Sequence, residues 1–259
     1  GGTAGGGGSN LVTGEGEIPG GAQPPGTAGQ PRFTPAQQQF IRLLQSLGEP
    51  QLSEIEAIQV TESIRDWLDS DGNVSPSGAE DDFYFGRTPA HRAGNRPMSD
   101  VSELRAVANV TPELYCALLP LVTVWPQSSA TLNIHTALPA VLRTINEDGD
   151  LSPLSESDVE LLVAQRQEPG FATFEEFIAH PALEGKELGG LTALLGETSS
   201  YFLLSASVEV ADRTTRLYSV LRRNERQVVA VTRHGGVSEP LCLRSVGTGP
   251  DGEQEGIGG

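Results

Sequence analysis

The chain crowds carboxylates into one short stretch, "DSDGNVSPSGAEDD" at residues 69–82, which holds five acidic residues and no Lys or Arg. Such like charges repel one another unless a cation neutralises them. Oxygen-bearing side chains recur at alternate positions and then at the twelfth, the spacing of the ligands in a calcium-binding loop: Asp69, Asp71, Asn73, Ser75, Ser77 and Glu80. The stretch therefore predicts a calcium site, with Asp81 and Asp82 as further candidate ligands.

The loop departs from the EF-hand pattern at the residue that makes the sharp turn. An EF-hand has Gly at its sixth position, whereas this chain has Val74 there and Gly72 two residues earlier. Pro76 is also unusual in such a loop. We therefore expect calcium to be held along another backbone path. The alternatives are a solvated acidic loop and a set of acids that cap the following helix.

A second stretch nearly repeats the first, since "DGNVSP" at 71–76 returns as "DGDLSP" at 148–153. Its oxygen-bearing residues are Asn146, Asp148, Asp150, Ser152, Glu156 and Asp158. No Glu has the spacing from the other oxygen-bearing residues that a ligand binding a cation through both oxygens would need. Ser155 with Asp158 is typical of a helix N-terminus. The favoured interpretation of 148–158 is a turn that links two helices, and a second calcium site is the alternative.

Signatures of catalysis are weak. The sequence has no G-x-S-x-G, H-E-x-x-H or C-x-x-C motif, and its four His are scattered. A hydrolase that uses a carboxylate pair such as Glu80 and Asp82 remains an alternative, as does a helix-hairpin-helix protein that binds nucleic acid through 103–122 and 171–183. The turn of the first of these segments lacks glycine.

Charge argues against the nucleic-acid alternative. The chain has 34 acidic and 17 basic residues and a net charge of −17, whereas a phosphate-binding surface needs clustered Lys and Arg. The same charge disfavours an anionic membrane surface. There is no apolar run long enough to cross a bilayer. Cys116 and Cys242 could form a disulfide or could be two small buried residues.

The elements around the acidic loop change in type along the chain. Residues 1–34 are rich in Gly and Pro and predict a flexible segment, with "SNLV" at 9–12 as a local strand. Residues 35–200 show helical periodicity, with capping boxes at Ser53 with Glu56 and Thr173 with Glu176. From 201 to 235 the period becomes two, which predicts three antiparallel strands, and 236–259 predicts a flexible acidic tail. Helices followed by strands predict the α+β class.

Several motifs in order resemble one family. These are "DWLDSDG" and "GAEDDFY" within 66–84, "AHRAGNRPMSDVSEL" at 90–104, "LNIHTA" at 132–137 and "GFATFEEFI" at 170–178. Together with the strand-rich 201–223, they resemble the minor pseudopilin K family of the type II (general) secretion pathway. The resemblance extends from about 40 to 233. The leader and hydrophobic helix with which that family begins are missing from this chain.

The resemblance implies a pilin-like antiparallel sheet with a large inserted helical domain of the SAM-like or helix-hairpin-helix-like kind. It implies a non-enzymatic subunit that caps the tip of the periplasmic pseudopilus and helps to initiate its assembly. The implied partners are the minor pseudopilins I and J, with pseudopilin H and the major pseudopilin as further candidates. The missing helix would anchor the whole protein on the periplasmic side of the inner membrane. Calcium in the helical insert is implied too, at Asp69, Asp71, Glu80 and Asp81, with Asn73 and Asp82 as weaker candidates.

Overall fold

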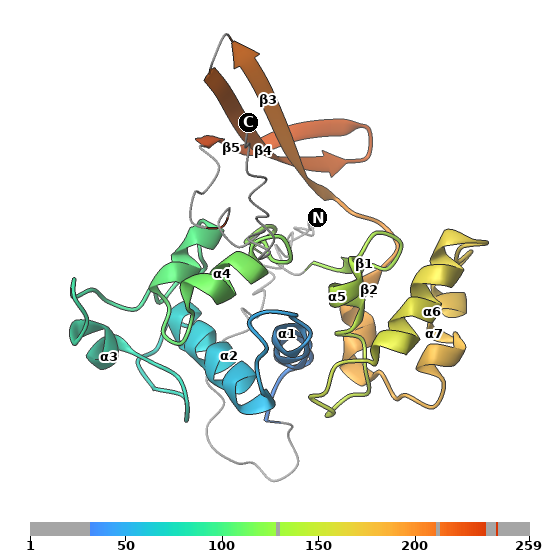
Figure 1. Ribbon diagram of the computed structural model, residues 1–259, viewed down its shortest axis with the longest axis horizontal. Coiled ribbons are helices and arrows are strands. Elements are labelled where there is room, and N and C mark those ends of the chain that lie inside the picture. Colours follow the sequence, from blue (N-terminus) through green and yellow to red (C-terminus); the bar gives the residue numbers. More distant parts are fainter. Residues whose placement is uncertain (1–31, 128–129, 211–212, 237–241, 243–259) are drawn as a thin grey trace, which may run out of the picture.

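The computed structural model describes residues 32–127, 130–210, 213–236 and 242. They form a body of helices and a separate three-stranded sheet (Figure 1). The expected flexible segment and the "SNLV" strand lie outside the described residues, except that Phe33 is buried and Thr34 caps the first helix. The helical body therefore includes residues just before Pro35. Among the described residues, no helix is long and apolar enough to span a membrane.

The first half of the body is built on α1 (Pro35–Gln45) and α2 (Glu54–Leu68). Each begins with a reciprocal capping box, as expected at Ser53 with Glu56. Their apolar faces meet in a core that includes Ile41, Leu44 and Val60. Three shorter elements complete this half: α3 (Asp81–Phe85), η1 (Val101–Ala106) and α4 (Pro112–Leu118).

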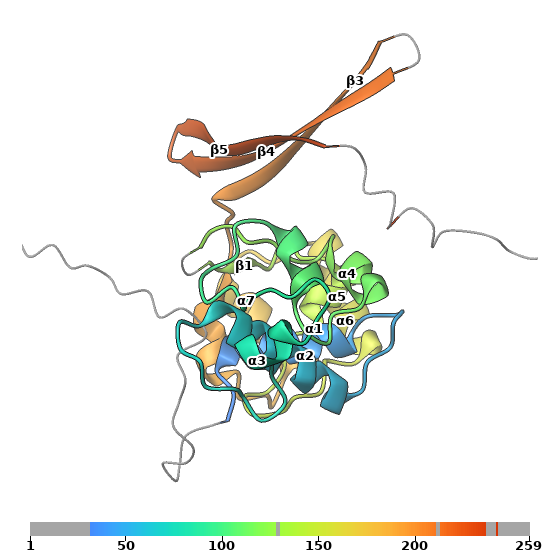
Figure 2. The ribbon, with the colours of Figure 1, turned by 90° about the vertical axis from the view of Figure 1, so that its left-hand side faces the viewer.

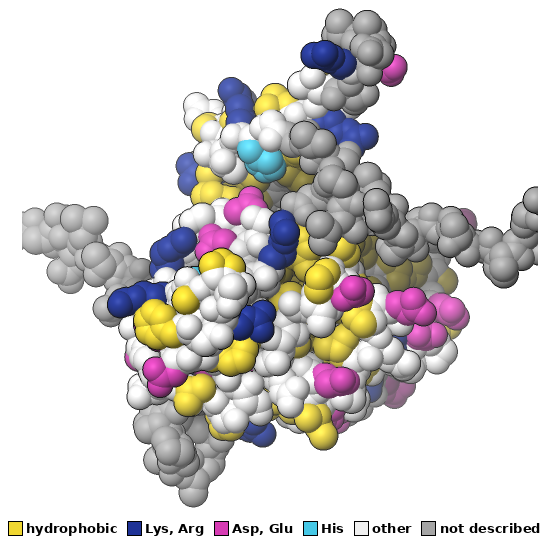
Figure 3. All heavy atoms as spheres, turned by 60° about the vertical axis from the view of Figure 1, so that its left-hand side comes forward, with side chains coloured by type: hydrophobic (Ala, Val, Ile, Leu, Met, Phe, Trp, Pro, Cys, Tyr) yellow, Lys and Arg dark blue, Asp and Glu magenta, His cyan; other side chains and the backbone are white. Residues whose placement is uncertain are grey.

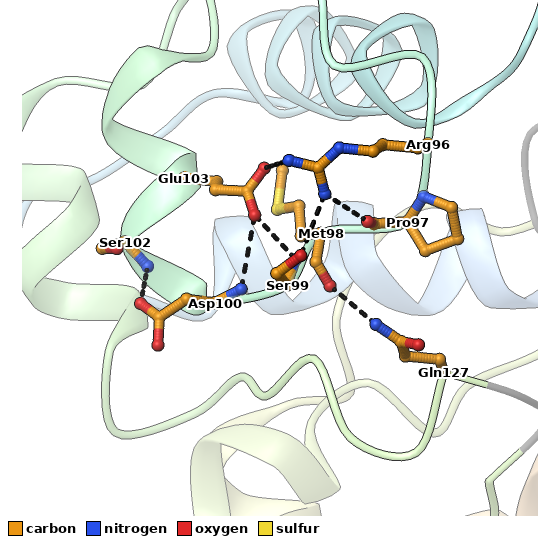
Figure 4. A network of polar contacts seen from close by, with 8 residues as sticks. All are labelled: Arg96, Pro97, Met98, Ser99, Asp100, Ser102, Glu103 and Gln127. Atoms are coloured by element: carbon orange, nitrogen blue, oxygen red, sulfur yellow. Dashed lines mark hydrogen bonds and ion pairs between the residues drawn. The ribbon is translucent and has the colours of Figure 1, made fainter. Parts of the chain in front are cut away.

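Within the range of helical periodicity, residues 98–110 form only the short 3-10 helix η1 after an ordered loop (Figure 4). The side chain of Glu103 accepts hydrogen bonds from the N–H groups of Ser99, at 2.7 Å, and Asp100. Arg96 pairs with the same carboxylate and also donates to Ser99 Oγ. These local bonds satisfy backbone groups that a longer α-helix would otherwise bond, and they fix the loop between α3 and η1.

The second half of the body surrounds a core that includes Ile134, Leu162 and Phe177. Its elements are β1 (Leu132–Asn133), α5 (Pro139–Leu142), α6 (Glu156–Gln167), α7 (Phe174–Ile178), η2 (Pro181–Leu183), η3 (Gly189–Leu194) and β2 (Leu195–Gly196). Strands β1 and β2 form a short parallel pair that periodicity could not reveal. The capping box expected at Thr173 is only half formed, because the Glu176 carboxylate accepts from Ala172 N–H instead of Thr173 N–H.

Arg42 joins the two halves from the inner face of α1. Its side chain is 1% exposed, and its guanidinium donates to the carbonyl oxygens of Thr144, Glu147 and Asp150. The three carbonyls lie in or just before the second acidic stretch, and Gln38 Oε1 also accepts a hydrogen bond from Gly149 N–H in its turn. The stretch thus links α5 to α6 as expected, and the positively charged guanidinium of Arg42 lies against its backbone carbonyl groups.

The sheet consists of β3 (Tyr201–Val210), β4 (Arg213–Asn224) and β5 (Gln227–Gly236) in the order β3-β4-β5. Both pairings are antiparallel, as the period of two predicted, and a bulge interrupts the β4–β5 register beyond Val220. Directly paired residues of an antiparallel sheet share a face. One face is apolar and exposed, and it carries Phe202, Leu204, Val208, Leu217 and Val228.

The sheet stands apart from the helical body in two perpendicular views (Figures 1 and 2). Where the chain enters β3, Arg223 of β4 donates from its backbone N–H to Ser200 O and from its guanidinium to Ser199 O. A second connection lies beyond β5, where Cys242 forms a disulfide with Cys116 of α4. The pairing that the sequence left open is therefore present, and it ties the chain after the sheet to the helical body.

We expect replacement of both Cys116 and Cys242 by Ser to lower the free energy of unfolding by about 2–5 kcal/mol. The disulfide closes a segment of 126 residues, and a link across a long segment restricts the unfolded chain strongly. Thermal unfolding with and without a reductant measures this effect. The reductant should shift the melting temperature of the parent and leave that of the double variant unchanged. An equal shift in both would contradict the prediction.

Candidate functional site

The first acidic stretch leaves α2 at Asp69, crosses an irregular loop and enters α3 at Asp81. Two of its candidate carboxylate ligands are buried, with Asp69 5% and Glu80 7% exposed. Neither oxygen of either carboxylate has a hydrogen-bond partner among the described residues. Arg65 Nε lies 3.9 Å from Asp69 Oδ2, beyond hydrogen-bond range. Burying an ionised carboxylate without compensation is costly, so such a group either takes up a proton or binds a cation.

The pKa values of these two groups show the same conflict. Burial, followed by the charges of Asp66, Asp69, Asp71 and Asp81, raises the pKa of Glu80 to about 7. Burial and the charges of Asp71 and Asp66 raise the pKa of Asp69 to about 6, against the opposing charge of Arg65. Both shifts follow from desolvation and from neighbouring charges of the same sign. The carboxylates therefore lie close enough to repel one another in the folded protein.

The remaining candidates occupy different places. Asp71 is half-buried and accepts hydrogen bonds from the N–H and side-chain amide of the exposed Asn73. Asp81 accepts from Ala93 N–H at 2.9 Å, which closes the segment from α3 to residue 93. Asp82 is exposed on the first turn of α3. The charges of Asp69, Asp71 and Asp81 all act on Glu80, but the four side chains do not converge on one point as a metal cluster would. Asn73 and Asp82 lie at the surface.

Two buried acids of α2 help to shape this loop and were missed by the sequence reading. Asp66 is fully buried and accepts from both the N–H and the hydroxyl of Ser75. Glu62 accepts from Ser77 N–H at 2.7 Å and from Arg32 at 2.8 Å. Glu62, Asp66 and Asp69 are spaced to share one helical face. That spacing is the signal that could have identified them.

The donor set fits calcium in its chemistry. Calcium takes hard oxygen ligands from carboxylates, carbonyl groups and water, and the buried oxygens of Asp69 and Glu80 are of that kind. No three His, Cys, Asp or Glu side chains within the described ranges already form a cluster that could hold a metal ion. Carbonyl oxygens or water would thus have to complete any coordination sphere around these carboxylates.

Gly78 is required by the way the loop folds over Asp66. A Cβ atom at Gly78 would lie 1.9 Å from Asp66 Oδ2, whereas a Cβ at Gly72 would meet nothing within 4 Å. We expect Gly78→Ala to cost about 1–3 kcal/mol of stability, because Asp66 would have to release Ser75. Urea denaturation measures the loss, and Gly72→Ala is the matched control in the same loop. Equal effects of the two substitutions would show that the contact with Asp66 is unimportant.

Two grooves lie elsewhere on the molecule. One of about 460 Å³ is lined by residues of α5 and α6, among them Pro139 and Val163. The other, of about 510 Å³, lies where the helical body meets β3 and includes Asn133 and Arg223. Neither of these two grooves includes Glu80 or Asp82.

Comparison with known proteins identifies the family. Residues 10–127 and 132–198 match two families that are both described as type II secretion system protein K. The type II secretion system protein K of Klebsiella pneumoniae is 31% identical over 202 residues, which are 77% of this chain and 60% of that protein. The protein of the same name from Aeromonas hydrophila is 33% identical over 205 residues, with the same shares.

A solved structure gives the same result at the level of the fold. It is the crystal structure of the GspK-GspI-GspJ complex from the type 2 secretion system of enterotoxigenic Escherichia coli. The TM-score is 0.68 at 26% identity, over 85% of this chain and 75% of that one. The chain spans about 60% of the length of the curated relatives it matches. The two family matches together cover most of residues 10–198, and the chain belongs to the type II secretion system protein K family.

Proposed function

We propose that this protein is a non-enzymatic minor pseudopilin that caps the tip of the periplasmic pseudopilus and helps to initiate its assembly. The observation that carries the proposal is the likeness of this fold to the solved structure of a complex of GspK with GspI and GspJ. The corresponding partners of this chain are the minor pseudopilins I and J. Pseudopilin H and the major pseudopilin are further candidates. The exposed apolar face of the sheet, which includes Phe202 and Leu217, supports an assembly role because large apolar patches mark interaction surfaces.

The place of action that goes with this role is the periplasmic side of the inner membrane. An N-terminal helix of the whole protein, outside the sequence described, would provide the anchor. The disulfide between Cys116 and Cys242 supports an extracytoplasmic location, because disulfides persist in oxidising compartments such as the periplasm. A net charge of −17 gives no support to the nucleic-acid alternative.

Co-purification tests the proposal directly. The protein should be produced together with the periplasmic domains of pseudopilins I and J from the same bacterium, with a tag on one partner only. We expect a ternary complex of equal stoichiometry by size-exclusion chromatography with light scattering. Each binary mixture is the matched control. If the protein elutes alone from every mixture, the tip-subunit proposal fails.

We further propose that calcium stabilises the helical body by binding at the acidic loop. Asp69 and Glu80 would provide the principal carboxylates, with Asp71 and Asp81 beside them. When bound, calcium would neutralise the repulsion among these groups and would join the end of α2 to the start of α3. A ligand that binds only the folded state stabilises it according to its concentration relative to the dissociation constant.

A further inference from the structure

The surface next to the acidic loop has an unusual composition. Residues 83–99 contain Arg87, Arg92 and Arg96 but no Asp or Glu, although the chain has twice as many acidic as basic residues. Phe83 is 43% and Phe85 is 49% exposed within the same segment. Two large aromatic side chains exposed within three residues require an explanation, because burial of a Phe side chain would contribute about 1.5–3 kcal/mol.

Each of the two Phe rings lies against a different Arg. The Arg87 Cζ lies 5.5 Å from the centroid of the Phe83 ring, and the Arg92 Cζ lies 5.6 Å from that of Phe85. Neither Arg forms an ion pair within the described part of the chain, whereas Arg96 is paired with Glu103 (Figure 4). We call Phe83, Phe85, Arg87 and Arg92 the Phe–Arg patch. Stacking on a ring leaves guanidinium N–H groups available for carboxylates.

The backbone beneath the patch is held in place by buried groups. Tyr84, between the two exposed rings, is fully buried and accepts a hydrogen bond from Ala108 N–H through its hydroxyl. His91 N–H donates to Tyr84 O, and Ala93 N–H donates to the Asp81 carboxylate. The patch is therefore displayed by a fixed scaffold rather than by a free loop. Fixed Arg and aromatic side chains lose little entropy on binding and are enriched among the residues that dominate interface energetics.

We propose that the Phe–Arg patch is a docking surface for an acidic segment of a partner protein that carries aromatic or aliphatic side chains between its carboxylates. Charge complementarity selects this partner, because the two unpaired Arg would bind carboxylates and the two Phe rings would bury apolar groups. Hydrophobic and basic side chains adjoin on the face that carries α3, which is turned toward the viewer in Figure 3. An anionic membrane is the less suitable ligand, because a wide anionic surface would repel a chain whose net charge is −17, whereas a short acidic segment contacts the patch alone.

Fluorescence anisotropy with a labelled peptide rich in Glu and Phe tests the proposal. We expect the protein to bind this peptide with an affinity that falls as salt is added. Arg87→Gln combined with Arg92→Gln, or Phe83→Ala combined with Phe85→Ala, should weaken binding by about tenfold or more. Arg222→Gln combined with Arg226→Gln is the matched control, because it removes two exposed Arg of the β4–β5 hairpin, one in β4 and one in the turn, and changes the net charge equally.

The outcomes are distinct. Retained binding in the control and loss in both patch variants, at unchanged melting temperature, supports the proposal. It is overturned if the parent does not bind the peptide, or if the control loses as much affinity as the patch variants. Patch-dependent binding to anionic phospholipid vesicles without binding to the peptide also overturns it. The proposal does not depend on the tip role, because the peptide assay needs neither pseudopilin I nor J.

Discussion

In a chelating buffer the protein should lose stability as the pH rises from about 4.5 to about 7, and in calcium it should gain stability over the same range. The first effect follows from Glu80, whose pKa rises from its ordinary 4.5 to about 7 on folding. A carboxyl with a raised pKa in the folded state contributes its full stability below the unfolded pKa. That contribution is lost as the pH rises through the folded pKa.

The size of this effect is large for one side chain. Each pKa unit corresponds to about 1.4 kcal/mol, and Asp69, with a pKa of about 6, adds to the loss in the same direction. Solvent near the loop reduces the sum, and we expect about 2 kcal/mol between the two ends of the range. Calcium reverses the sign because it binds the deprotonated carboxylates, so its stabilisation grows with pH.

Differential scanning calorimetry across this pH range, with calcium and with chelator, measures both slopes. Glu80→Gln should flatten the slope in chelator and should remove most of the stabilisation by calcium. Asp82→Asn is the matched control because Asp82 is exposed on the same short helix. If calcium leaves the melting temperature unchanged at pH 8, or if the two variants behave alike, the metal proposal is refuted.

Replacing Arg42 by Met should destabilise the protein by about 3–5 kcal/mol, because three carbonyl groups lose their donor and each unsatisfied acceptor costs about 1–3 kcal/mol. Met retains much of the apolar volume but leaves the carbonyl oxygens of Thr144, Glu147 and Asp150 without their donor. Buried acceptors that lose their donors bear the full cost of desolvation. Because Arg42 connects α1 to the second acidic stretch, the loss should affect both halves of the body.

Urea denaturation monitored by fluorescence and by circular dichroism measures this loss, with the exposed Arg226→Met as control. Calcium should not restore the lost stability, because the favoured interpretation of 148–158 is a turn that links two helices and not a metal site. A loss below about 1 kcal/mol would mean that other groups satisfy the carbonyls. Full rescue by calcium would instead identify 148–158 as a second metal site, the alternative that its sequence left open.

Local sequence signals anticipated much of this fold. Periodicity and caps placed α1, α2 and α6, and alternation placed β3, β4 and β5, because these signals act within a single element. The contacts between elements were not readable from the chain. Arg42 reaches carbonyls more than 100 residues away, and nothing in the helix that contains it distinguishes this Arg from a surface residue.

The candidate site shows the same division. The density and spacing of acids in 69–82 identified the loop. Which of these acids are buried depends on how α2 and α3 pack, and their residues Trp67 and Tyr84 lie in a shared core. Packing separated the buried Glu80 from the exposed Asp82, although both belong to one acidic run. The role of Asp66 could not be predicted, because its partner Ser75 is nine residues further along the chain and meets it only when the loop folds back.

The disulfide gives the molecule two routes for mechanical load. Without the disulfide, a force applied to the sheet would reach the helical body only through the chain that enters β3, and unfolding would begin at that point. With Cys116 joined to Cys242, the same force also arrives at α4, within the core that supports the acidic loop. Tension on the sheet is then divided between two points of the helical body, the entry to β3 and helix α4.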